Sequence, residues 1–96
     1  MRVEFATPAN SEFLAVIEYY QLERSGLGGA FIDDVESAVQ LLGDFPLIGA
    51  PAPSGARRMH LRRFPYSLVY KATTEVVWIV AVEHHNRLPG FWRDRL

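Results

Sequence analysis

The residues best suited to exchange protons are gathered in the second half of the chain. Two adjacent histidines, His84 and His85, follow a strongly apolar run, and a third, His60, lies among arginines. Histidine is the side chain that ordinarily changes charge near neutral pH, so His84 and His85 are the candidate catalytic residues. Because neighbouring residues of a strand point in opposite directions, at most one of the two is expected to face a site.

A run of basic residues from Arg57 to Arg63 suggests contacts with an anion. If this run is a strand, its side chains alternate, and the set Arg58, His60 and Arg62 lies on one face. We predict that this wholly cationic or titratable set faces phosphate. The candidate target-binding or phosphate-binding residues are Arg58, His60, Arg62, Arg63, Arg87 and Trp92. Two alternatives stay open: the arginines only keep an edge strand soluble, or Trp92 closes the end of a core instead of stacking on a base.

Several kinds of site are disfavoured. The chain has no cysteine, which excludes disulfides, thiolate metal ligands and a thiol nucleophile. Adjacent histidines point apart and His60 is the only other imidazole, so we expect no metal site and no cofactor. Glycines near Leu27 lack the patterns of phosphate-binding loops.

Charge is distributed unevenly along the chain. The formal net charge is −1, but residues 1–56 hold two basic and eight acidic side chains, whereas residues 57–96 hold eight basic and three acidic ones. This asymmetry predicts a cationic surface on the second half that meets an anionic partner. The alternative is that the two halves neutralise each other across the fold.

The periodicity of apolar residues predicts the elements that position these side chains. We expect a strand over residues 2–6, a helix capped by Thr7 with Pro8 at its first position and ending near Arg24, and a second helix from Phe31 to about Gly43. After a connector over residues 46–56, strands are expected over 57–63, 66–72 and 76–83, the last buried on both faces or central. The fold class is thus α+β, ordered β-α-α-β-β-β, with a helical hairpin on a mostly antiparallel sheet.

Length and composition indicate one domain over residues 1–96. No signal sequence or membrane span is expected, and the absence of cysteine fits a soluble protein of the reducing cytoplasm.

The order of elements and several strings resemble the RelE/ParE superfamily of toxins, also known as plasmid stabilisation proteins. The strings are Glu18 to Tyr20, Gly26 to Gly28, Phe45-Pro46 with Gly49, Arg62 to Tyr70, and His84 to Arg93. Together they cover nearly the whole chain.

The resemblance implies the toxin of a type II toxin–antitoxin pair, held inactive in a hetero-oligomer with its cognate antitoxin. RelE-like members cleave messenger RNA on the ribosome, whereas ParE-like members poison DNA gyrase. A third alternative is a non-toxic relative that only binds nucleic acid or antitoxin. The ribonucleases carry an arginine where this chain has Ser67 and a catalytic tyrosine or histidine near the end, where this chain has Phe91 and Trp92. These departures weaken the interpretation as a ribonuclease.

Overall fold

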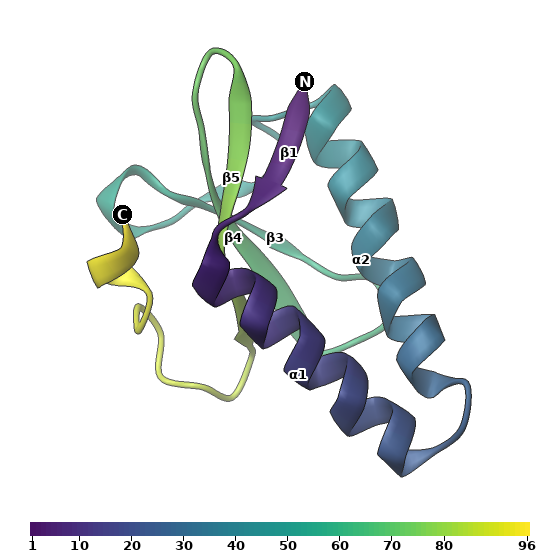
Figure 1. Ribbon diagram of the computed structural model, residues 1–96. Helices are drawn as coiled ribbons and strands as arrows, with labels where there is room; N and C mark the ends of the chain where they lie inside the picture. The colour runs from purple at the N-terminus through teal and green to yellow at the C-terminus, as the bar shows by residue number, and fades with distance from the viewer.

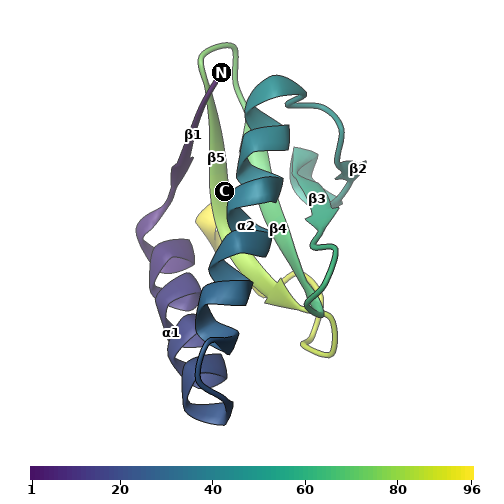
Figure 2. The same cartoon turned by 90° about the vertical axis from the view of Figure 1, so that its right-hand side faces the viewer.

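A computed structural model describes all residues, 1–96, and shows two helices lying against one face of a five-stranded sheet (Figures 1 and 2). The elements, in chain order, are β1 (Arg2–Phe5), α1 (Thr7–Glu23), α2 (Leu27–Asp44), β2 (Ala50–Pro51), β3 (Arg57–His60), β4 (Tyr66–Ala72) and β5 (Val76–His84). Short 3-10 turns occupy Pro53–Gly55 and Arg93–Arg95. The strand order is β1-β5-β4-β3-β2, with β1 parallel to β5 and all other pairs antiparallel. This arrangement confirms the predicted α+β class and element order.

The main core lies between the helical hairpin and the sheet. Tyr20 of α1 and Phe31 of α2 pack with Phe64 and Tyr66, and the Tyr20 and Phe64 ring centroids are 4.7 Å apart. Burial raises the pKa of Tyr66 to about 12, with further contributions from the charge and hydroxyl of Tyr20. The two layers are therefore joined by a dense group of aromatic rings, which bury large apolar areas.

The face of the sheet opposite the helices is covered by the segment that follows β5, and we call this face of the sheet the tail face. Trp92 is fully buried there against Val69, Val80 and Ala81. β5 has β1 and β4 on its two sides and is buried on both faces, as its continuous apolar run predicts. The segment after β5, expected to be a polar tail, thus contributes a core residue.

Three local expectations are corrected by the structure. Ala6, not Thr7, is the N-cap of α1, and no side chain caps this end. α2 begins at Leu27, four residues before Phe31. The basic strand ends at His60 instead of residue 63, because the carboxylate of Asp34 accepts hydrogen bonds from the backbone N–H groups of Arg62, Arg63 and Phe64 at 3.3, 2.9 and 3.1 Å. These bonds hold residues 62–64 in a turn beside α2.

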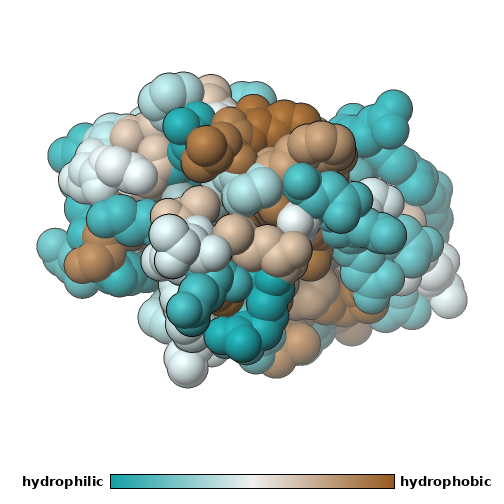
Figure 3. All heavy atoms as spheres, turned by 90° about the horizontal axis from the view of Figure 1, so that it is seen from above, coloured by the Kyte–Doolittle hydropathy of each residue, from teal (hydrophilic) through white to brown (hydrophobic).

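Neither helix is both long and apolar enough to cross a membrane. The surface carries apolar side chains at one end of the molecule. Viewed from the end at which α2 finishes, apolar side chains gather in patches between polar ones (Figure 3). The connector after α2 leaves Phe45, Leu47 and Ile48 more than half exposed.

Candidate functional site

Strand register gathers the chemically active residues on the tail face. His60 of β3 pairs with Ser67 of β4, which pairs with Glu83 of β5, and cross-strand partners share one face of a sheet. Arg58 lies two residues before His60 and therefore on the same face. These strand ends open into a pocket of about 210 Å³, which we call the histidine–arginine pocket, lined by Arg58, His60, Glu83, His84, His85, Arg87 and Pro89.

A buried serine connects two of the pocket histidines. The Oγ atom of Ser67 lies 2.5 Å from Nδ1 of His60 and 3.0 Å from Nε2 of His85. The two imidazole rings meet edge to face, with centroids 4.9 Å apart. Ser67 itself has no exposed surface, whereas both histidines are exposed. We call this arrangement the His–Ser–His relay, because one hydroxyl joins two groups that exchange protons.

Arg58 is held by a buried carboxylate. Its Nε donates to Oε1 of Glu83 at 2.6 Å, and the indole Nε1 of Trp92 donates to Oε2 of the same carboxylate at 2.9 Å. Burial works to raise the pKa of Glu83, but the hydrogen bonds from Arg58 and Trp92, the Arg58 charge and a backbone bond from Gly90 outweigh it and lower that pKa. Arg58 is thus paired within the protein, and its charge is largely neutralised at the pocket.

Arg87 and His84 complete the pocket differently. Arg87 is half exposed and stacks over the ring of Phe91, 3.6 Å from its centroid. His84 turns to the helix face, where its ring meets Tyr66 edge to face. Its Nδ1 accepts a hydrogen bond from the backbone N–H of Asn86 at 2.9 Å, which places the proton of the neutral ring on Nε2.

The remaining candidates from the sequence lie elsewhere. Arg62 and Arg63 line a separate polar hollow with Asp33, Asp34 and Ser37, beside α2. Trp92 is fully buried, so its ring has no free face on which a base could stack. The predicted row of Arg58, His60 and Arg62 is therefore reduced to its first two members, because the strand ends at His60.

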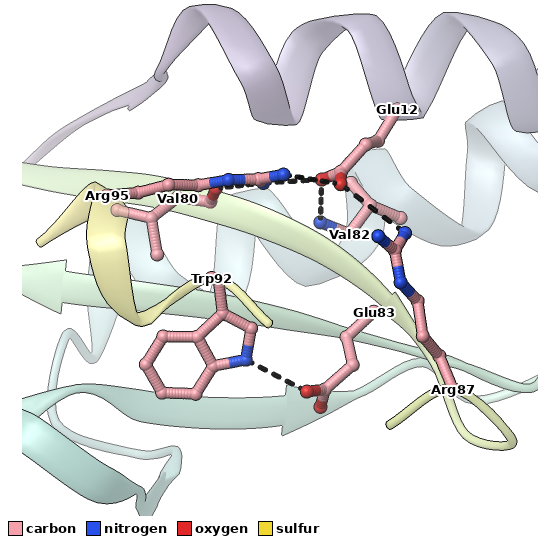
Figure 4. A network of polar contacts seen from close by, with 7 residues as sticks. All are labelled: Glu12, Val80, Val82, Glu83, Arg87, Trp92 and Arg95. Carbon is pink, nitrogen blue, oxygen red and sulfur yellow. Dashed lines mark hydrogen bonds and ion pairs between the residues drawn. The ribbon is translucent and has the colours of Figure 1, made fainter. Parts of the chain in front are cut away.

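A second polar network provides hydrogen-bond partners for backbone groups of β5 that have no neighbouring strand (Figure 4). β1 ends at Phe5, opposite Ile79, so later residues of β5 lack a neighbouring strand on that side. In its place, the carboxylate of Glu12 in α1 accepts from the N–H of Val82 at 3.0 Å, and Arg95 donates to the carbonyl of Val80 at 2.9 Å. Arg95 also binds Glu12 through two nitrogens, at 2.9 and 3.0 Å. We call this pair the edge clamp.

The helical hairpin carries an apolar groove. It has a volume of about 520 Å³ and is lined by Phe5, Phe13, Leu14, Ile17, Ile32, Val35, Glu36, Val39 and Gln40. Leu14 remains 56% exposed, which is unusual for a leucine beside a core. An open groove between two helices that is lined mostly by apolar side chains is a candidate site for binding an amphipathic segment.

Sequence reasoning missed several of these roles. From the sequence, Ser67 stands out only because the related ribonucleases have an arginine at its position. Nothing in the neighbouring residues indicates that two histidines contact its hydroxyl. Glu83 gives a clearer signal, since it is a lone acid that directly follows the apolar run Val76 to Val82. Glu12 and Arg95 are 83 residues apart, so only the folded chain brings them together.

The helical hairpin on one face of a sheet ordered β1-β5-β4-β3-β2 agrees with the resemblance of the sequence to the RelE/ParE superfamily of toxins. The family model for the ParE toxin of the type II toxin–antitoxin system parDE matches residues 3–89. The chain belongs to this ParE toxin family.

A solved structure supports the fold. The chromosomal ParDE toxin–antitoxin system from P. aeruginosa contains a chain that is 20% identical and superimposes with a TM-score of 0.75, over 88% of this chain and 95% of that one. No curated protein sequence is similar enough to match. The role of this protein is that of the toxin in a toxin–antitoxin pair, and its partner is an antitoxin.

Proposed function

We propose that this toxin arrests growth by binding DNA gyrase, not by cleaving messenger RNA on the ribosome. The observation that carries the proposal is the state of the two positions where the RelE-like ribonucleases hold catalytic side chains. Ser67 is buried, and its hydroxyl is hydrogen-bonded to His60 and His85. Trp92 is also buried, and its indole N–H, the only polar group of the side chain, is hydrogen-bonded to Glu83. Neither presents a cation or a transferable proton to RNA. Membership of the ParE family points the same way.

Two assays with the purified protein test this proposal. Inhibition of gyrase supercoiling that is reversed by the cognate antitoxin is expected, and no cleavage of a purified transcript is expected. The same protein added to programmed ribosomes should leave the messenger intact. Cleavage of the messenger without an effect on gyrase would refute the proposal.

A specific observation favours ribosome-dependent cleavage as the second candidate. His60 and His85 offer two imidazoles about 5 Å apart at one pocket, and RNA cleavage requires a general acid and a general base. Of the two arginines that line the pocket, Arg58 is already paired with Glu83, so stabilisation of the phosphorane charge falls to Arg87. For this reason we rank this function second.

We further infer that the antitoxin neutralises the toxin by placing an amphipathic helix in the hairpin groove. A helix laid in an apolar groove is a common mode of recognition for segments that fold on binding. The groove is almost wholly apolar, and Glu36 and Gln40 at its edge can hydrogen-bond the polar side of such a helix.

Paired substitutions on α1 test the groove. Leu14→Asp places a charge in the groove, and we expect the antitoxin Kd to rise at least tenfold, roughly the effect of 1.4 kcal/mol. Leu22→Asp is the matched control, because Leu22 is 79% exposed on the same helix and does not line the groove. Both variants should melt near the wild-type temperature. Equal binding by both would place the antitoxin elsewhere.

A further inference from the structure

The geometry around Ser67 restricts the protonation of two histidines. A serine hydroxyl carries one hydrogen and therefore donates one hydrogen bond. Nδ1 of His60 and Nε2 of His85 both lie within hydrogen-bonding distance of this oxygen. One imidazole must accept the serine proton, and the other must donate its own N–H to the oxygen.

The two outer nitrogens are consequently linked. A neutral imidazole has one N–H, so if His60 accepts at Nδ1, its proton lies on Nε2. His85 then donates through Nε2, and its Nδ1 is an acceptor. Rotation of the Ser67 hydroxyl reverses both assignments. While both rings are neutral, the outer pair always consists of one donor and one acceptor, and one added proton converts both into donors.

The groups that face the relay favour a negative ligand. Arg58 and Glu83 neutralise each other at 2.6 Å. Glu12 is bound by Arg95 at 2.9 Å and lies 3.8 Å from Arg87. Because this one carboxylate is shared between two cations, it neutralises Arg87 only in part, and Arg87 can still attract an anion. His84 also lines the pocket, but its ring turns towards Tyr66, and the proton of its neutral form lies on Nε2.

We propose that the histidine–arginine pocket binds the phosphate group of a nucleotide or nucleic acid and takes up one proton through the His–Ser–His relay when it does so. Phosphate oxygens only accept hydrogen bonds at neutral pH, so they select the state in which both outer nitrogens donate. Arg87 supplies the permanent charge. The inference does not depend on whether gyrase or another target is arrested.

A deoxythymidine dinucleotide is a suitable probe, because its phosphodiester keeps one charge across the relevant pH range. Histidines ordinarily titrate between pH 5 and 8. By linkage, the Kd measured by calorimetry on the untagged protein should rise about tenfold between pH 6 and 8. Titrations in buffers with different heats of ionisation should give about one proton taken up per dinucleotide near the upper end of this range.

Conservative variants separate the relay from simple charge. His60→Asn and His85→Gln keep a polar atom near Ser67 and remove the outer nitrogen, so each should lose most of the pH dependence. Arg87→Gln should weaken binding by a similar factor at both pH values and leave the proton uptake unchanged. Arg62→Gln, with the same loss of charge outside the pocket, should bind like the wild type.

Ser67→Ala gives the most specific result. Without the hydroxyl, both rings can direct N–H outward while neutral, so binding at pH 8 should be retained or improved and proton uptake should fall. If this buried substitution unfolds the protein, the two histidine variants still decide the matter.

Several outcomes would overturn the proposal. They are a wild-type Kd that is equal at pH 6 and 8, no detectable binding, and displacement of the dinucleotide by acetate as readily as by sulfate, which would indicate a carboxylate ligand. Failure of sulfate to displace it would show that the nucleoside, not the phosphate, is recognised.

Discussion

Glu83 is a buried carboxylate on which the position of Arg58 depends. Since its pKa is below the ordinary value of 4.5, the folded protein favours the charged form. Its contribution to the free energy of unfolding is therefore complete above about pH 4.5 and is lost as the pH falls through the lower value of the folded state. Glu83→Gln should destabilise at pH 7 by about 1–3 kcal/mol and flatten the acid side of the stability profile. Urea denaturation at pH 3–7 measures both effects.

The basic residues should separate toxicity from stability, with one exception. Alanine at Arg63, His84 or Arg87 removes an exposed or partly exposed group and leaves no buried charge unpaired, because Glu12 keeps Arg95 when Arg87 is lost, so melting should stay near wild type. Arg58→Ala should instead destabilise the protein, because it leaves the Glu83 carboxylate buried without its cation.

Growth arrest on induction, measured beside melting curves, checks this pattern. Arrest should be relieved in at least two of the four variants. As core controls, Leu42→Ala and Ile79→Ala should cost about 2–5 kcal/mol, because both side chains are fully buried. Full toxicity in all four charged-site variants would place the active surface on the helices or the tail.

Among the elements, the contact between α1 and α2 depends on the absence of a side chain at Gly28. A Cβ atom there would lie 2.9 Å from the carbonyl oxygen of Ile17 and 3.0 Å from Cβ of Gln21. Gly28→Ala should therefore push the helices apart and cost about 1–3 kcal/mol. Gly29→Ala meets nothing within 4 Å and should stabilise α2 by about 0.5–1 kcal/mol. The thermal midpoint of Gly28→Ala should therefore fall below that of the wild type, and that of Gly29→Ala should rise above it.

The edge clamp replaces a missing strand with two side chains. Glu12→Gln weakens the acceptor for Val82 N–H, and Arg95→Gln removes the donor to Val80. Each should cost about 1–3 kcal/mol, because a backbone group loses its partner. A double-mutant cycle by urea denaturation should show coupling above 0.5 kcal/mol, the threshold typical of residues in one network. Additive effects would mean that the two contacts are independent.

The pattern of apolar residues was enough to predict every main element of this fold, because Val35 and Leu42 mark the buried side of α2 and the continuous run Val76 to Val82 marks a strand buried on both faces. β2, with two residues, was beyond such a pattern. The early end of β3 depends on Asp34, which is 28 residues from the first backbone N–H it binds. The relay was also out of reach, because His60 and Ser67 come from two strands and His85 from the turn after β5, and their meeting depends on strand register.

At the scale of the molecule, the opposite charges of the two halves are not neutralised by the fold. Among the acids of residues 1–56, Glu12 alone forms ion pairs with arginines of the second half. The remaining basic residues, Arg57, Arg62, Arg63, Lys71 and Arg93, have no ion-pair partner. The asymmetry seen in the sequence therefore persists in the folded toxin and is available to an acidic partner.

The two layers are also joined by titratable groups. The folded-state pKa of Tyr66 is raised to about 12 from 10.0, and burial raises that of Tyr20 as well. A raised pKa contributes stability that is complete below pH 10 and lost as the pH rises towards 12. Wild-type protein should thus lose stability steeply over this range, and Tyr66→Phe, which cannot ionise, should lose less. Chemical denaturation at pH 9–12 gives the comparison.

Because Trp92 is buried between the C-terminal segment and the sheet, its intrinsic fluorescence can report on the position of that segment. The other tryptophan, Trp78, is 38% exposed, so Trp78→Phe leaves a single indole that is shielded from water and bonded to Glu83. Its emission should be blue-shifted while the tail covers the sheet and should move to the red when the tail lifts. Stopped-flow mixing with antitoxin or target would then time any rearrangement of the C-terminal segment without an added label.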